Sequence, residues 1–123
     1  MNRRPSPISN TRESSGRLLF ISGQIAMGSD GTVVHPGDPR AQAVMAFEQI
    51  GAALAAHGCA FESVVKLTTF VVDARDIAAI SDARADFFTG PYPTATTVAV
   101  AALARPGLLV EIEAIAELPD VRE

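Results

Sequence analysis

The first part of the chain combines a strand pattern with a turn pattern. Residues 18–25 form a largely apolar run, which predicts a buried β-strand. The turn-forming residues 29–32 follow, and together with Val33 and Val34 they predict a hairpin. Residues 1–15 are polar and contain prolines, so we expect an irregular N-terminal arm with at most one short edge strand.

A first helix is predicted after this hairpin by its start signal and its periodicity. Asp38 suits the N-cap, because its carboxylate accepts hydrogen bonds from the first turn, and Pro39 suits the first helical position. Apolar residues then recur at spacings of three and four, which places one apolar stripe on the helix. The stripe consists of Val44, Phe47, Ile50 or Gly51, and Leu54. His57 and Gly58 end the helix, since glycine readily takes the left-handed conformation of a helix cap.

The second half of the chain follows the order strand, helix, strand, strand. Residues 64–72 are rich in β-branched side chains and apolar on both faces, which is typical of an internal strand. Residues 76–88 predict a second helix. Its side chains at helical spacing are Ile77, Ile80, Arg84 and Phe87 or Phe88. Residues 96–103 and 108–118 predict two strands joined by a turn at Pro106 and Gly107.

These elements predict an α+β layer, in which two helices cover one face of a mixed sheet of five or six strands. The last strand alternates in character, with apolar side chains on one face and carboxylates on the other. The carboxylates are Glu111, Glu113 and Glu117. Because the face opposite the helices needs its own cover, we expect the sheets of neighbouring subunits to pack around a central barrel.

Length and composition add one domain and a tendency to self-associate. The 123 residues fit a single domain that spans 1–123. Hydrophobic residues make up 48% of the chain and its mean hydropathy is +0.23, so a monomer of this size exposes much apolar surface. The formal net charge is −4 and the ten Lys and Arg residues are scattered, which argues against nucleic acid and anionic membranes as partners.

The cysteine and the termini favour the cytoplasm. Cys59 is the single cysteine, so the chain forms no internal disulfide, and a reducing compartment is the default. No run approaches the ~20 apolar residues of a membrane span, and no apolar segment follows Arg3 and Arg4. His35 and His57 are too far apart in sequence to suggest a metal site. We therefore expect a cytoplasmic protein with no metal, cofactor or membrane contact.

Four short runs, in this order, carry a family resemblance. They are residues 21–25 (ISGQI), residues 64–71 (VVKLTTFV), Phe87-Phe88 ahead of Pro91-Tyr92-Pro93, and residues 93–98 (PTATTV) with residues 110–116 (VEIEAIA). The chain resembles the RidA (YjgF) family of enamine/imine deaminases. It departs from the family in lacking an N-terminal Gly-Pro-Tyr motif, in having Ser81 where many members have asparagine, and in a longer turn at residues 104–107.

The resemblance implies a homotrimer of chorismate-mutase-like fold, with small-molecule ligands in clefts between subunits. In deaminating members a glutamate positions the attacking water, and an arginine in a Pro-Ala-Arg-Ser/Thr run binds the substrate carboxylate. Glu111 takes the place of the glutamate, whereas Ala95 stands in the place of the arginine. The substrate-binding positions are then Ser22, Gly23, Ser81, Phe88, Ala95, Thr96 and Thr97.

The chemistry of imine hydrolysis agrees with part of this assignment. It requires a placed water, a proton for the nitrogen and a hold on the substrate. Glu111 suits the first task, although a solvated strand carboxylate is the alternative, and Gly23 suits either a ligand or close packing. Lys66 is more simply structural than a Schiff-base residue, and Cys59 more simply a space-filler than a nucleophile.

The missing arginine has no obvious replacement in the sequence. A charge-assisted hydrogen bond is worth ~1.5–3 kcal/mol, and Ala95 offers none. Arg105 lies roughly 30 Å along a straight strand, so only one from another subunit approaches the site. Arg84 projects from the second helix, where we expect it to cover apolar surface.

The sequence therefore predicts a cofactor-free, enamine/imine deaminase-type hydrolase for a small reactive metabolite, with poor activity on generic 2-imino acids because of Ala95. Two alternatives stay open. One is a ligand-binding or pathway-specific member of the same trimeric fold that does not deaminate, and the other is a trimer that acts only as a protein partner. The cation-poor surface also argues against ribonuclease activity.

Overall fold

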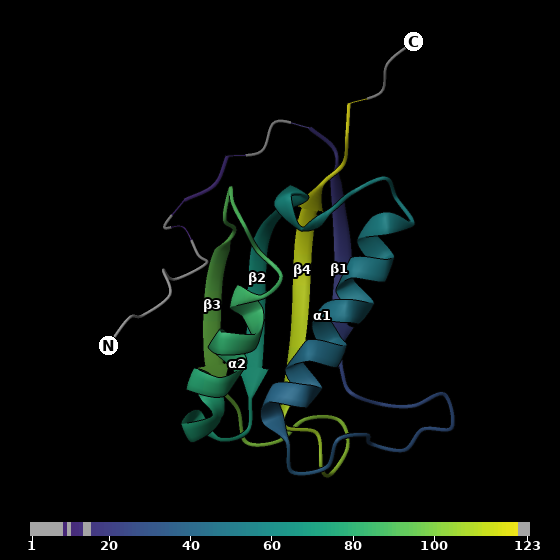
Figure 1. Cartoon of the computed structure of the whole chain (residues 1–123), viewed down its shortest axis with the longest axis vertical. Coiled ribbons are helices and arrows are strands. Elements are labelled where there is room, and N and C mark those ends of the chain that lie inside the picture. The colour runs from purple at the N-terminus through teal and green to yellow at the C-terminus, as the bar shows by residue number, and fades with distance from the viewer. Residues whose placement is uncertain (1–8, 10, 14–15, 121–123) are drawn as a thin grey trace.

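The computed structural model describes residues 9, 11–13 and 16–120 and consists of one sheet with two helices on one face (Figure 1). In chain order its elements are β1 (Leu18–Gln24), α1 (Pro39–Ala55), β2 (Val64–Val71), α2 (Ile77–Ala85), β3 (Thr94–Ala99) and β4 (Val110–Glu117). Two short 3₁₀ helices, Phe61–Ser63 and Ala74–Asp76, precede β2 and α2. The predicted α+β class, with both helices on one face of a mixed sheet, is confirmed.

The sheet has the strand order β1-β4-β2-β3. β4 runs antiparallel to both β1 and β2, whereas β2 and β3 are parallel. Four strands form in the described part of the chain, not the five or six expected. The two strands that the sequence predicted to be joined by the turn at Pro106 and Gly107 are not neighbours in the sheet, because α2 carries the chain across to a parallel edge position beside β2. Residues 100–109 then lead back to β4 on the other side of β2.

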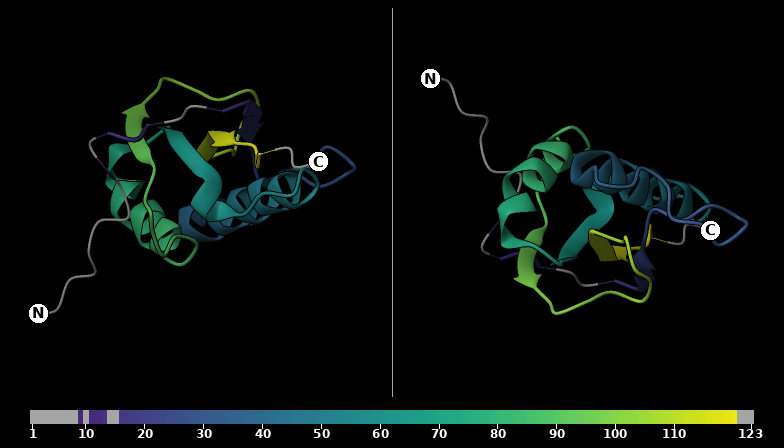
Figure 2. Two further views of the ribbon diagram at one scale, coloured as in Figure 1. Left: turned by 90° about the horizontal axis from the view of Figure 1, so that it is seen from above. Right: turned by 90° about the horizontal axis from the view of Figure 1, so that it is seen from below.

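The core lies between the sheet and the helices. α1 buries Phe47, Ile50 and Leu54 completely, and β4 buries the alternate residues Ile112 and Ala114 on the same side of the sheet. α1 packs on β4 and β1, while α2 lies over the β2 and β3 half (Figures 1 and 2). The apolar stripe predicted for the first helix therefore faces the sheet, as expected.

The helix boundaries follow from their caps. The Asp38 carboxylate accepts a hydrogen bond from Ala41 N at 3.0 Å, which confirms the predicted N-cap. α1 ends at Ala55, and Gly58 follows with a φ of +72°, the left-handed region that favours glycine. α2 is shorter than predicted, mainly because it ends at Ala85 and not at Phe88.

The N-terminal part differs from the predicted hairpin. A single bridge joins Met27 to Val33, and the loop between them is closed by a bond from Gly28 N to Thr32 O at 2.8 Å. Residues 1–8, 10, 14 and 15 of the predicted arm lie outside the described residues. Ser9 forms a bridge with Thr94 at the outer edge of β3.

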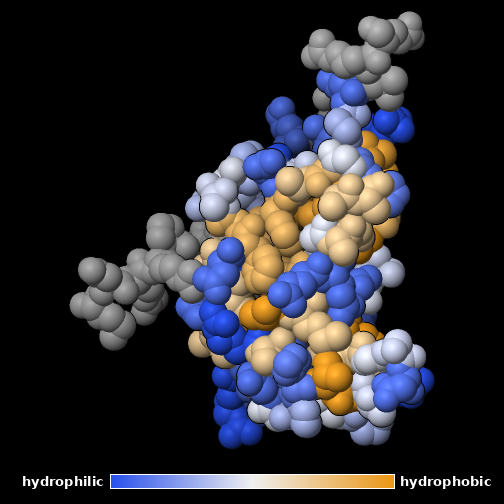
Figure 3. All heavy atoms as spheres, turned by 45° about the vertical axis from the view of Figure 1, so that its right-hand side comes forward, coloured by the Kyte–Doolittle hydropathy of each residue, from blue (hydrophilic) through white to orange (hydrophobic). Residues whose placement is uncertain are grey.

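The face opposite the helices is open and largely apolar at one edge. Phe20 is 70% exposed there, on the edge strand β1, and Leu18 of the same strand is also exposed, whereas the exposed Val98 lies on the opposite edge strand, β3. The helical side interleaves apolar and hydrophilic residues (Figure 3). Among the residues that the structure describes, neither α1 nor α2 has the length and apolar character that a bilayer-crossing helix requires.

Candidate active site

Glu111 and Gly23 are in contact on the open face of the sheet. Glu111 lies opposite Phe70 of β2, so its side chain projects away from the helices. β1 shifts register between Ile21 and Gln24, and Gly23 lies within this irregular stretch. A Cβ atom on Gly23 would lie 2.5 Å from Cδ of Glu111, closer than real contacts allow. Glycine is therefore required here because the Glu111 side chain crosses the backbone of β1.

The Glu111 carboxylate has no hydrogen-bond partner among the described residues, and its side chain is half-buried. Ser22 is exposed beside it, and the carbonyl of Ser22 accepts a bond from Gln24 Nε2 at 2.9 Å, which fixes the end of β1. An anionic group without a partner, held against an edge strand, is able to orient a water or accept a proton.

The other predicted positions divide between the two faces of the sheet. Ala95 lies opposite Leu67 and Thr97 opposite Thr69, and because Leu67 and Thr69 are buried, both positions face the helices. Ala95 packs against the core. Thr96 has the opposite orientation and is exposed on the open face.

Two predicted positions belong to α2 and the turn after it. Ser81 is half-buried, and its hydroxyl accepts a hydrogen bond from Nη2 of Arg84 at 3.4 Å. Phe88 is 4% exposed and meets Phe47 and Phe61 edge to face, with centroids 6.1 and 5.2 Å apart. Its ring thus forms part of an aromatic cluster in the core, and a binding role for Phe88 stays a prediction.

Arg84, which we considered from the sequence as a replacement for the missing arginine and assigned to covering apolar surface, has an unusual environment. Its side chain is buried, with 6% of the residue exposed, instead of lying over apolar surface at the protein exterior. Nε is buried without any hydrogen-bond partner, and burial lowers the pKa of the guanidinium from its ordinary value. The group still carries its charge at neutral pH. The sequence contained a sign of this burial, since Arg84 occupies a position in the apolar stripe of the second helix.

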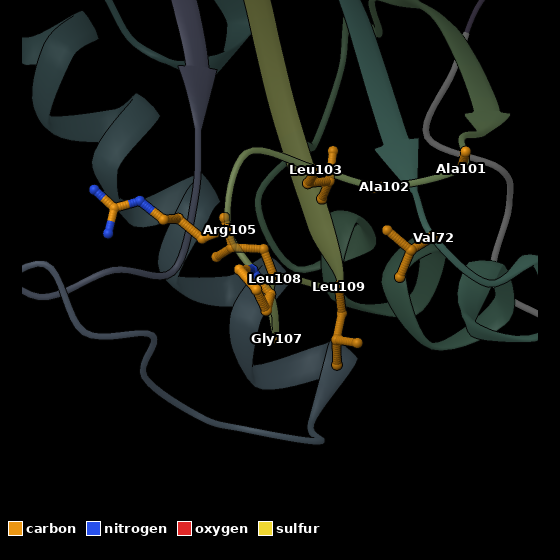
Figure 4. Close-up of a pocket in the computed structure, with 9 residues that line it drawn as sticks. Val72, Ala101, Ala102, Leu103, Arg105, Gly107, Leu108 and Leu109 are labelled. Carbon is orange, nitrogen blue, oxygen red and sulfur yellow. The ribbon is translucent and has the colours of Figure 1, made fainter.

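A cavity of about 380 Å³ lies at the end of the sheet, between the end of β2 and the connection from β3 to β4 (Figure 4). Its walls are mostly apolar, with Val72, Ala101, Leu103, Leu108 and Leu109 among them. The side chain of Arg105 extends away from Val72 and Ala101. None of the predicted site residues lines this cavity, so it brings no acid, base or nucleophile to the predicted chemistry.

The remaining candidates have ordinary surroundings. Lys66 is exposed on the open face and donates from Nζ to Oγ1 of Thr68 at 3.2 Å. Cys59 is partly buried against the core. The described residues contain no group of three His, Cys, Asp or Glu side chains placed to hold a metal ion.

The candidate site is therefore split into two halves. The open-face half consists of Ser22, Gly23 and Glu111, and the helix-side half consists of Ser81, Arg84, Ala95 and Thr97. β1 and β3 are the two edges of the sheet, and the halves lie on its opposite faces. One chain does not bring the two halves together.

Comparisons with known proteins agree with this architecture. A family model described as Endoribonuclease L-PSP matches residues 5–118. Protein DfrA of Myxococcus xanthus is 41% identical, over 83% of this chain and 77% of the relative. A 2-iminobutanoate/2-iminopropanoate deaminase of Capra hircus is 39% identical, over 81% of this chain and 72% of the relative. The crystal structure of YyfB, a Rid-family protein of unknown function from Yersinia pestis, aligns with a TM-score of 0.83 and 34% identity, over 93% and 89% of the two chains.

Proposed function

Because the chain belongs to the Endoribonuclease L-PSP family, which includes the RidA (YjgF) proteins, we propose that it hydrolyses a small enamine or imine without a cofactor. The observation that carries the proposal is the Glu111 carboxylate, which lacks a partner among the described residues and lies against the one glycine that leaves room for it. The relatives named as iminobutanoate/iminopropanoate deaminases support the reaction class.

In the proposed reaction Glu111 orients a water and takes its proton as the oxygen adds to the C=N carbon. Glu111 passes this proton on to the substrate nitrogen, which gives a carbinolamine. Loss of ammonia from this intermediate leaves the carbonyl product, so that one water is consumed for each ammonia released. β1 is an edge strand, so some of its backbone N–H groups near Ser22 are available to a substrate oxygen.

We further propose that the working species is a homotrimer, with the ligand in a cleft between two copies. The apolar open face supports this, because an exposed Phe20 flanked by Leu18 is typical of a surface that another chain covers. The split site supports it as well. A neighbouring copy would bring its helix-side half to the open-face half of the first chain.

The test is hydrolysis of a freshly generated imine. An amino acid oxidase or a threonine dehydratase supplies the imine, semicarbazide competes for it, and carbonyl product is measured. Glu111→Gln should lower the rate by ~10²–10⁴ with the oligomer intact. Glu113→Gln, on the same face two residues further along β4, is the matched control and should keep the rate. Equal rates for the wild type and Glu111→Gln would show that this carboxylate takes no part.

A second candidate function rests on Ala95, which offers no donor where deaminating relatives of the RidA type hold the carboxylate. In this alternative the chain binds a small carbonyl or imine ligand and does not turn it over. Calorimetry that detects binding of a neutral carbonyl compound, with no turnover in the hydrolysis assay, would favour the ligand-binding function.

A further inference from the structure

Arg84 carries a positive charge in a place where nothing in the described chain neutralises it. The residue is 6% exposed, and its single hydrogen bond among the described residues is the long one to Ser81. Nε is buried without a partner. Transferring a charge from water to the protein interior is unfavourable unless ionic or hydrogen-bonding partners compensate it. The cost suggests that a partner is supplied from outside the chain.

The direction of the side chain follows from its neighbours on α2. Asp82 and Asp86 both bond Arg40 of α1, at 3.1 and 2.7 Å, so they mark the side of α2 that faces α1. Arg84 lies midway between them in sequence, which puts it about 180° around the helix from their mean direction. Arg84 therefore projects toward the sheet on the side remote from α1, and α2 covers the β2 and β3 half of that sheet.

Two residues of β3 on the helix side of the sheet have short side chains. Ala95 and Thr97 face the helices, and Ala95 ends at its Cβ. β3 is the edge strand, so a small molecule reaches this side of it without crossing the sheet. The helix-side half then contains one cation, the two hydroxyls of Ser81 and Thr97, and the short apolar side chain of Ala95. This combination suits a carboxylate attached to a small carbon skeleton.

We propose that Arg84 binds the carboxylate of a small oxo or imino acid, with Ser81 beside it and Ala95 leaving the space. The guanidinium that β3 lacks at residue 95 is in this way supplied from α2. The inference rests on the proposed function for the identity of the site, and it names the substrate class. It also revises the expectation, drawn from Ala95 alone, that 2-imino acids are poor substrates.

Binding of 2-oxobutanoate, compared with its neutral amide, tests the proposal by calorimetry on the full chain. The wild type should bind the acid at least about tenfold more tightly than the amide, since charge-assisted bonds are roughly twice as strong as neutral ones. Arg84→Met keeps the length and apolar stem of the side chain and should abolish this preference. Arg75→Met removes an exposed arginine that pairs with Asp73 and is the matched control, which should keep the preference.

Two further measurements separate binding from folding. Arg84→Met should unfold at the same or a higher temperature than the wild type when no ligand is present, because it removes an uncompensated buried charge. Saturating 2-oxobutanoate should raise the unfolding temperature of the wild type and not that of Arg84→Met. Ala95→Leu, which fills the space and keeps the guanidinium, should also lose the preference for the acid.

The outcomes distinguish this inference from the proposed function. An acid preference that depends on Arg84, in a protein that hydrolyses no imine, would support the carboxylate site and contradict the hydrolase. Imine hydrolysis at equal rates in the wild type and Arg84→Met would support the hydrolase and overturn the role of Arg84. An Arg84→Met protein that unfolds at a lower temperature and still prefers the acid would show that the residue is structural, and would also overturn the proposal.

Discussion

The two halves of the candidate site carry charges of opposite sign, one of them half-exposed and the other buried. On the open face, the Glu111 carboxylate lacks a partner but is half-exposed, so water solvates it at little cost. On the helix side, the Arg84 guanidinium lacks a charged partner among the described residues and is buried, so loss of its hydration raises the free energy of the folded chain. An exposed unpaired group has an ordinary explanation on most proteins, whereas a buried one requires compensation.

The separation of the two halves would leave a single chain incomplete as an enzyme. The sheet separates the halves, and its strand order puts β1 and β3 at its two far edges. No change of side-chain conformation brings Glu111 and Arg84 to the same substrate. A second copy that covers the open face would do so.

The largest effect is expected from Phe20→Asp. Phe20 is 70% exposed on the open face, and a carboxylate in its place would be buried without a partner if another copy covers it. We expect light scattering to change from three times 12.9 kDa to a single chain, and imine hydrolysis to fall below detection because the two halves separate. Ala52→Asp, on the exposed side of α1, should change neither the mass nor the rate. A wild-type protein that is a folded monomer at micromolar concentration would contradict the assembly itself.

Gly23→Ala should have the next largest effect, confined to the open-face half. The added Cβ would overlap the Glu111 side chain, which must then swing away from β1. A displacement of about 1 Å at a catalytic group costs on the order of 10²-fold in rate, so kcat/KM should fall by about that factor. Gly16→Ala is the matched control, because its Cβ would meet no atom closer than 3.7 Å. An active Gly23→Ala enzyme would mean that the position of Glu111 is unimportant for the reaction.

Much of this architecture was predictable because local signals and tertiary packing agree. The Asp38-Pro39 start, the apolar stripe of α1 and the alternation along β4 each specify an element and the face it buries. Strand neighbours were not predictable in the same way. The sequence predicted two strands joined by a turn at residues 106–107, but β3 pairs with β2, and pairing between distant segments leaves no signature within either segment.

The sequence named residues in both halves of the candidate site, but it gave Arg84 no binding role. The resemblance drew attention to Ser22, Gly23 and Glu111 together, and the structure brings these residues to one place. It also assigned a binding position to residue 95 and left that position without a donor. Arg84 was visible as a charged residue in an apolar stripe, but only the fold shows that it is buried and faces away from Asp82 and Asp86.

The smallest effect, and the sharpest test of the comparison, is Ala95→Arg in two backgrounds. In the wild-type background the new guanidinium shares the helix-side half with Arg84, so repulsion between the two cations should leave activity on 2-iminobutanoate unchanged or lower. In the Arg84→Met background it should restore roughly tenfold or more of the lost rate, the value of one charge-assisted hydrogen bond of ~1.5–3 kcal/mol.

The four rates form a double-mutant cycle, and the coupling energy between residues 84 and 95 is the measured quantity. A substantial coupling means that residues 84 and 95 act on one carboxylate. A guanidinium from either α2 or β3 can then bind it. Equal gains in the two backgrounds would place Arg84 outside the ligand's reach. The buried charge of Arg84 would then have a role in the fold alone. The helix-side half would present no positive charge to a substrate.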